Sequence, residues 1–337
     1  MRLSAACVVF LVACGARSSL DTPDPGDASS PVGAPPDGVC PFRTPTTLVH
    51  DVSGGAYFPD DTFLYFLAAT PNNVHLDCAL WRVDKRTAAV TMLSLTNDSC
   101  GSIALDDLAV FFTTVAVADG AVTVTRAPKD GSMPTTLFDV PGQASSSGGV
   151  AVDDANVFVV GVGGVWAGAK SAPSQPVLRI AEPSATLLLV DANAIYARIH
   201  PSTNEQIASF SKVSGAPLTV LNGNVGLLRG MTQDDQFIYW NTTNDFLTGR
   251  IMRVPKLGGA SEMMAEGQFR QSQLAVDSRY VYCQGPDGNL ESISKSDLSQ
   301  RHYPSGYHML NDGSPLAVDD ACAYWSELDQ PIRVGPK

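Results

Sequence analysis

The sequence predicts an all-β fold, a seven-bladed β-propeller of four-stranded antiparallel blades in which an N-terminal strand closes the last blade. Three observations predict it. An aspartate motif and a lysine motif each occur seven times in the same order, and a segment near the N-terminus supplies the strand that the seventh repeat lacks. Seven repeats of about 42 residues, each with four short strands, are typical of propellers.

The aspartate motif marks the first two strands of each repeat. An apolar residue stands three positions before the aspartate, and an aromatic residue preceded by an aliphatic one stands five positions after it. Large apolar residues on both faces predict a second strand that is buried on both sides. The aspartates are Asp60, Asp106, Asp153, Asp191, Asp234, Asp277 and Asp319. The aromatic residues are Tyr65, Phe111, Phe158, Tyr196, Tyr239, Tyr282 and Tyr324.

The lysine motif marks the end of the third strand, with an apolar residue five positions before each lysine. The lysines are Lys85, Lys129, Lys170, Lys212, Lys256, Lys295 and Lys337. An outer run such as residues 218–221 then completes the repeat, but the seventh repeat ends at its lysine. Residues 45–48 have the same sequence, Pro-Thr-Thr-Leu, as residues 134–137 of the second repeat. We therefore expect residues 44–52 to supply the outer strand of blade 7, which removes a free sheet edge.

The aspartates invite a calcium interpretation, because five of them are followed by a second acid. These second acids are Asp61, Asp107, Asp154, Asp235 and Asp320. Calcium requires six to eight oxygens from a compact loop, whereas adjacent strand residues point to opposite faces. The favoured interpretation is a turn in which the aspartate accepts backbone hydrogen bonds. We expect the aspartates and lysines to surround one face as exposed pairs that set register and solubility, and we predict neither a metal nor a cofactor.

The opposite face should carry the loops that join the second and third strands. These loops differ in length and character, and they span residues 68–78, 113–121, 198–205 and 241–249. Ligands usually bind to variable loops on a rigid scaffold. We expect a protein or glycan partner, of unknown identity, on this variable-loop face.

The N-terminal residues predict an export signal. Arg2 precedes an uncharged, mostly apolar stretch over residues 3–13, which is too short to span a bilayer as a helix. The stretch ends in Leu-Val-Ala-Cys-Gly at residues 11–15 and resembles the bacterial lipobox. The resemblance implies cleavage after residue 13 and lipid attachment to Cys14. The alternative is an ordinary signal peptide followed by a free cysteine.

The resemblance to the lipobox implies that the protein contacts the membrane only through its N-terminal lipid. Gly15 is compatible with the outer membrane by the rule for enteric lipoproteins. Residues 14–40 contain mainly Pro, Gly, Ser and Asp and read as a disordered tether, and residues 41–337 form the propeller.

Five cysteines remain after residue 14, and an exported chain can pair them. Cys78 begins the third strand of blade 1, and Cys100 begins blade 2 on the same face, so this pair is the first choice. Cys40 precedes the closing strand and Cys322 follows the turn of blade 7, so a second bond would join them at the closure. Cys283 replaces an aromatic core residue and reads as a buried free thiol.

The repeats resemble two groups of propellers. Tyr239-Trp240-Asn241-Thr242 and Tyr324-Trp325-Ser326-Glu327 are similar to the YWTD-type repeat, although neither ends in Asp and that family has six units. Residues 230–259 fit AVDD-x-x-hYW followed by G-x-I-x-RVPK-x-GG. This pattern resembles repeat-bearing β-propeller lipoproteins of myxobacteria and covers nearly all of residues 44–337. It implies the fold and an envelope location, but no activity.

Charge and the absence of known motifs narrow the classes of function that the sequence predicts. The chain has 22 basic and 34 acidic side chains, a formal charge of −12, which argues against a nucleic-acid partner. No metal-ligand spacing or nucleophile motif occurs, and the five histidines are scattered. We expect a monomeric, non-catalytic binding or scaffold propeller. The alternative is a propeller enzyme, a lyase or glycan hydrolase, with its site at the mouth of the axial channel.

Overall fold

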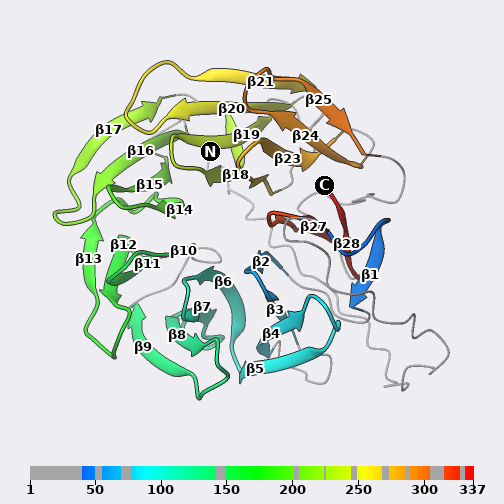
Figure 1. Ribbon diagram of the computed structural model, residues 1–337. Helices are drawn as coiled ribbons and strands as arrows, with labels where there is room; N and C mark the ends of the chain where they lie inside the picture. The colour runs from blue at the N-terminus through cyan, green and yellow to red at the C-terminus, as the bar shows by residue number, and fades with distance from the viewer. Residues whose placement is uncertain are drawn as a thin grey trace, which may run out of the picture.

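The computed structural model describes residues 40–49, 55–69, 77–140, 149–200, 205–223, 225–243, 249–267, 273–285, 288–303, 315–326 and 331–337. These residues form seven four-stranded sheets arranged in a ring around a central axis (Figure 1). The predicted fold class, an all-β propeller with seven antiparallel blades, is confirmed.

The first four blades follow the repeats in order. Blade 1 contains β2 (Tyr57–Pro59), β3 (Phe63–Ala69), β4 (Cys78–Asp84) and β5 (Val90–Thr96). Blade 2 contains β6 (Ser99–Leu105), β7 (Ala109–Val115), β8 (Val122–Pro128) and β9 (Thr135–Val140). Blade 3 contains β10 (Val150–Val152), β11 (Asn156–Gly161), β12 (Gly164–Ala169) and β13 (Val177–Ile180). Blade 4 contains β14 (Thr186–Val190), β15 (Ala194–Ile199), β16 (Gln206–Ser211) and β17 (Pro217–Asn222).

The last three blades include the one that closes the ring. Blade 5 contains β18 (Leu227–Gln233), β19 (Phe237–Thr243), β20 (Gly249–Pro255) and β21 (Glu262–Gly267). Blade 6 contains β22 (Ala275–Val276), β23 (Tyr280–Gln284), β24 (Leu290–Ser294) and β25 (Gln300–His302). Blade 7 contains β26 (Leu316–Val318), β27 (Cys322–Trp325), β28 (Ile332–Pro336) and, from the other end of the chain, β1 (Thr46–Val49).

The closing strand lies where the repeat pattern predicts it. β1 pairs antiparallel with β28, and Thr46 faces Val334 while Val49 faces Ile332. In Figure 1, β1 and β28, at opposite ends of the colour scale, lie side by side. The N-terminal strand therefore covers the sheet edge that the seventh repeat would leave unpaired.

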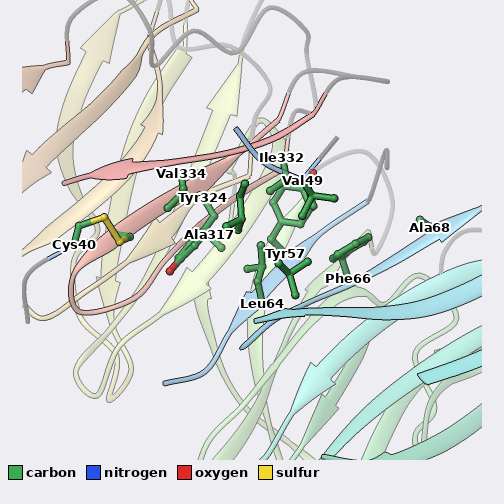
Figure 2. Packing of buried hydrophobic residues seen from close by; sticks show 13 residues of the cluster. Cys40, Val49, Tyr57, Leu64, Phe66, Ala68, Ala317, Tyr324, Ile332 and Val334 are labelled. Carbon is green, nitrogen blue, oxygen red and sulfur yellow. A yellow bond between two sulfur atoms is a disulfide. The ribbon is translucent and has the colours of Figure 1, made fainter. Parts of the chain in front are cut away.

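The hydrophobic core is divided among the interfaces between blades. At the closure, Val49 of β1 and Ile332 of β28 belong to one buried cluster with Tyr57 and Phe66 of blade 1 (Figure 2). Tyr57 also donates a hydrogen bond to the Ser326 hydroxyl of blade 7 at 2.6 Å. The same alternation of blade against blade continues around the ring, so each sheet buries both faces, as the apolar second strands predict.

No helix in the described part of the chain has the length and apolar character needed to cross a membrane.

Candidate functional site

Each motif aspartate stabilises the turn between the first two strands of its blade. In blade 1, Asp60 Oδ1 accepts hydrogen bonds from the backbone N–H groups of Thr62 at 2.9 Å and Phe63 at 2.7 Å. The same pair of bonds recurs in the other six blades. The turn interpretation of the aspartates is confirmed, and one carboxylate oxygen in each blade is occupied by it.

The second oxygen of each aspartate binds the motif lysine of the next blade. The seven pairs form a closed ring, which we call the Lys–Asp ring, on the face that we call the Lys–Asp face. Six of the Nζ–Oδ2 distances lie between 2.6 and 2.8 Å. The chain has seven lysines, and all of them belong to the ring. The pairs are Lys85–Asp319, Lys129–Asp60, Lys170–Asp106, Lys212–Asp153, Lys256–Asp191, Lys295–Asp234 and Lys337–Asp277.

The ring corrects the expectation of exposed pairs that serve solubility. The lysine side chains are only 7 to 20% exposed, and every pair joins two different blades. The burial has a physical cause, because five lysines extend over the tyrosine ring of the preceding blade at 5.2 to 5.8 Å. Partly buried pairs with additional hydrogen bonds contribute more than exposed ones, so the ring holds neighbouring blades together.

The aspartates of the ring remain charged to low pH. Burial raises the pKa of the Asp234 carboxyl, but hydrogen bonds from Lys295, Tyr239 and two backbone N–H groups outweigh it and lower the pKa to about 2. The other six aspartates shift in the same direction, with the neighbouring lysine opposing the effect of burial. The Tyr239 hydroxyl, which donates to Asp234 at 2.6 Å, has a raised pKa because of its burial and this carboxylate.

Each second acid is more exposed than the motif aspartate before it. Asp61, Asp107, Asp154, Asp235 and Asp320 are exposed at the same turns. The described residues contain no group of three or more His, Cys, Asp or Glu side chains placed to hold a metal ion. These carboxylates therefore give the Lys–Asp face a negative charge without forming a cation cage among the described side chains.

The variable-loop face differs from its sequence-based description. Thr113, Arg198 and Asn241, expected at the start of loops, lie in the second strands β7, β15 and β19. Residues 70–76, 201–204 and 244–248 of the expected loops lie outside the described residues. The strands extend into the segments expected to be loops because a hairpin such as that between β7 and β8 needs only a short turn. The Ala116 N–H closes this turn by donating a hydrogen bond to the Ala121 carbonyl.

These three polar residues occupy one repeated position, seven residues after the motif aspartate. Thr113 Oγ1 accepts the Ser102 N–H at 2.8 Å, and Asn241 Oδ1 accepts the Gly230 N–H at 2.5 Å. Both donors lie in inner strands whose register shifts at that point. The side chains thus satisfy backbone groups that a bulge removes from the ladder. The position was missed in the sequence, although it is polar in five of seven repeats: Thr113, Arg198, Asn241, Gln284 and Ser326.

Arg198 belongs to a polar cluster between blades 4 and 5 on the variable-loop face. Its guanidinium donates to Thr186 Oγ1 at 2.8 Å and to the Leu228 carbonyl at 2.6 Å. Glu205, which is buried, accepts the Leu228 N–H at 2.7 Å and pairs with His200 Nε2 at 3.1 Å. Burial lowers the pKa of Arg198, while Glu205 opposes the shift. The cluster attaches blade 4 to the inner strand of blade 5.

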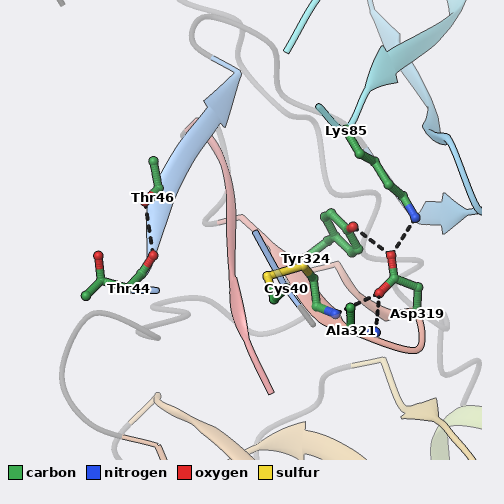
Figure 3. Close-up of a disulfide and its surroundings, with 8 residues drawn as sticks. Cys40, Thr44, Thr46, Lys85, Asp319, Ala321 and Tyr324 are labelled. Atoms are coloured by element: carbon green, nitrogen blue, oxygen red, sulfur yellow. Dashed lines mark hydrogen bonds and ion pairs between the residues drawn. A yellow bond between two sulfur atoms is a disulfide. The ribbon is translucent and has the colours of Figure 1, made fainter. Parts of the chain in front are cut away.

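The cysteines pair as the sequence suggests. Cys78 bonds to Cys100 between blades 1 and 2, and Cys40 bonds to Cys322 at the closure. Figure 3 shows the second bond beside Asp319, which receives Lys85 and Tyr324. The chain therefore enters the propeller on the Lys–Asp face.

Cys283 is a buried free thiol, as expected. Burial, together with the Glu291 charge, raises its pKa. A thiol that is both buried and protonated is unsuited to nucleophilic chemistry. The Glu291 carboxylate also lies 2.8 Å from Nδ1 of His302, which is mostly exposed.

Comparison with known proteins identifies the fold alone. No protein-family profile matches the chain, and no curated protein matches its sequence. The WD40 propeller domain of Doa1 is similar with a TM-score of 0.57 at 13% identity, over 87% of this chain and 96% of that one. The computationally designed Ika8 protein is similar with a TM-score of 0.56 at 12% identity, over 86% and 98%. A chain of the nidogen/laminin complex has a TM-score of 0.50 at 15% identity, over 77% and 94%.

These neighbours support the distant resemblance to other propellers, including the YWTD type. At 12 to 15% identity, these neighbours show a shared architecture and nothing beyond it. Propellers in general present a rigid surface for binding or assembly.

Proposed function

We propose that this chain is a non-catalytic binding propeller of the bacterial envelope, anchored through a lipid on Cys14 and engaging a protein or glycan partner on its variable-loop face. It would belong with the repeat-bearing lipoproteins of myxobacteria that its repeats resemble. The outer membrane is the proposed location.

The observation that carries the proposal is the point at which the chain enters the ring. Cys40 is bonded to Cys322 beside Asp319, so the segment that links Cys14 to the propeller joins the Lys–Asp face. An anchored molecule would then present its opposite face away from the attachment point. Two disulfides also fit an exported protein, because they persist in oxidising compartments.

The anchor is tested by Cys14→Ser in the full chain. The variant should keep its signal segment and lose lipid labelling, and the processed form should be absent from the membrane fraction. A processed variant that stays in membranes as the parent does would contradict the lipobox.

The partner surface is tested by photo-crosslinking in intact cells. A crosslinker at Val117, which is exposed on the β7–β8 hairpin of the variable-loop face, should capture one specific product. The matched control is Met133, which is exposed on the Lys–Asp side between β8 and β9. Equal capture at both positions, or none at Val117, would argue against a partner on the variable-loop face.

The alternative function, a lyase or glycan hydrolase, has one cluster to test among the described residues. Arg198, His200 and Glu205 lie together. However, Arg198 donates a hydrogen bond to the Leu228 carbonyl, and Glu205 accepts one from the Leu228 N–H. Glycan cleavage by the purified chain that is lost in Glu205→Gln, with an unchanged melting temperature, would favour the enzyme.

A further inference from the structure

Two blade interfaces on the Lys–Asp face share an arginine that fills the space beside the ring. In blade 5, the Arg253 guanidinium lies 4.8 Å from the centre of the Phe237 ring and donates to the Lys295 carbonyl of blade 6 at 2.7 Å. In blade 1, Arg82 lies 4.6 Å from the Phe63 ring and donates to the Lys129 carbonyl of blade 2, also at 2.7 Å. Each arginine precedes the lysine of its own blade by three residues.

The interface between blades 4 and 5 has no such arginine. Ser209 precedes Lys212 by three residues and pairs across the sheet with Tyr196, as Arg253 pairs with Tyr239. The position of the stacking phenylalanine is taken by Ala194. Two large side chains are therefore replaced by two small ones at the same place in the fold.

The result is an open groove of about 660 Å³ between blades 4 and 5, which adjoin in Figure 1. Its lining contains the Tyr196 and Lys256 that correspond to Tyr239 and Lys295 in the filled interface. Leu218 and Leu257 form apolar walls and are 58% and 98% exposed. The groove at the interface of blades 5 and 6, where Arg253 is present, is smaller, at about 430 Å³.

The charges in the open groove favour a cation. Lys256 is already paired with Asp191 at 2.8 Å, so this pair contributes no net charge. Asp235, an exposed carboxylate on blade 5, lines both this groove and the groove between blades 5 and 6, and Asp107 has the equivalent position on blade 2. In the filled interface Arg253 is neutralised by Glu262, and the lining of the open groove contains neither residue. Because Lys256 and Asp191 neutralise each other, Asp235 gives the open groove a net negative charge.

We propose that this groove is a docking site for an extended segment of another protein that carries an arginine flanked by aliphatic residues. The guanidinium of the bound segment takes the place that Arg82 and Arg253 occupy in the filled interfaces. In the open groove it donates to the Lys256 carbonyl and pairs with Asp235. Its aliphatic neighbours cover Leu218 and Leu257. Arginine fits better than lysine because its planar fork can stack and donate at the same time. This site lies on the Lys–Asp face and is independent of the partner proposed for the variable-loop face.

A labelled six-residue peptide of alternating leucine and arginine serves as the probe, titrated against the full chain by fluorescence anisotropy. The matched peptide carries citrulline, which is neutral and has nearly the same shape. A charge-assisted hydrogen bond predicts at least about tenfold weaker binding of the citrulline peptide. Equal binding of the two peptides, or no binding of the arginine peptide up to about 1 mM, would overturn the proposal.

Variants locate the site. Ser209→Arg combined with Ala194→Phe fills the groove from within and should abolish peptide binding without lowering the melting temperature. Asp235→Asn changes an exposed side chain and should weaken binding about tenfold. This second variant tests the site independently of whether the filled variant folds. Asp154→Asn at the equivalent turn of blade 3 is the control and should change nothing.

Two results would contradict the site. An effect of Asp154→Asn as large as that of Asp235→Asn would show a general attraction to an acidic surface. Concentration-dependent dimers of the parent chain that vanish in the filled variant, measured by sedimentation, would identify a second copy as the occupant.

Discussion

Lys85 of blade 1 pairs with Asp319 of blade 7, which lies 234 residues further along the chain. This contact completes the Lys–Asp ring at the junction where the two ends of the propeller meet. The same aspartate lies beside the Cys40–Cys322 bond (Figure 3). Blades 1 and 7 are therefore held together by an ion pair and a shared core, while the disulfide fixes the segment before β1 to β27 within blade 7.

The lysine and the aspartate of a ring pair should contribute unequally to the stability of the fold. Lys295→Met removes only the bridge between blades 5 and 6, whereas Asp234→Ala also removes two backbone hydrogen bonds of the turn and the acceptor of Tyr239. We expect losses in the free energy of unfolding of about 1 kcal/mol for the lysine and about 2 to 4 kcal/mol for the aspartate. Urea denaturation measures both, and equal losses would show that the turn bonds contribute little.

The ring should also set the acid stability. The folded pKa of Asp234 is about 2, below its ordinary value of 3.8, so folding is favoured by its ionised form. This contribution is complete above the unfolded pKa and is lost as the pH falls from about 4 towards 2. After allowance for solvent screening it amounts to about 1 to 2 kcal/mol. Asp234→Asn should therefore lose stability at pH 7 and show a shallower decline below pH 4 in thermal melts. Asp61→Asn, an exposed change at the turn of blade 1, is the control and should leave the melting temperature at pH 7 unchanged.

Deletion of residues 41–52 should destabilise the fold far more than its length suggests. It removes β1, so β28 would expose a row of backbone N–H and C=O groups at a sheet edge. We expect a lower melting temperature or association of molecules through this edge. Deletion of residues 16–36 is the matched control. Melting and sedimentation compare the two, and equal behaviour would contradict closure by β1.

The two disulfides should differ in their contribution to stability. Cys40–Cys322 spans 282 residues and Cys78–Cys100 spans 22, so the first closes a much longer loop in the unfolded chain. The chain-entropy relation predicts that removing the longer one, by Cys40→Ser with Cys322→Ser, costs about 2 kcal/mol more than removing the shorter one by the corresponding pair of serines. Denaturation of both double variants tests this, and a larger loss for the short loop would indicate that strain or local packing governs their effects.

The sequence determined the blade count, the turn aspartates and the closing strand by itself. The reason is that each repeat must supply the same strands and the same turn, so that Asp60 and Asp319 stand in equivalent contexts 259 positions apart. The cysteine pairs could be proposed as well, because Cys78, Cys100 and Cys322 stand at strand ends whose face the repeat defines and Cys40 precedes the closing strand.

Only the tertiary structure decided what these residues contact. Lys256 lies closer in sequence to Asp234 of its own blade than to Asp191, yet it binds Asp191, because neighbouring sheets bring the third strand of one blade over the turn of the preceding one. The empty place beside Ser209 likewise becomes visible only when blade 4 is compared with blade 5 in space. A repeat pattern specifies each blade, whereas the packing of blade against blade specifies which charges meet and which grooves stay open.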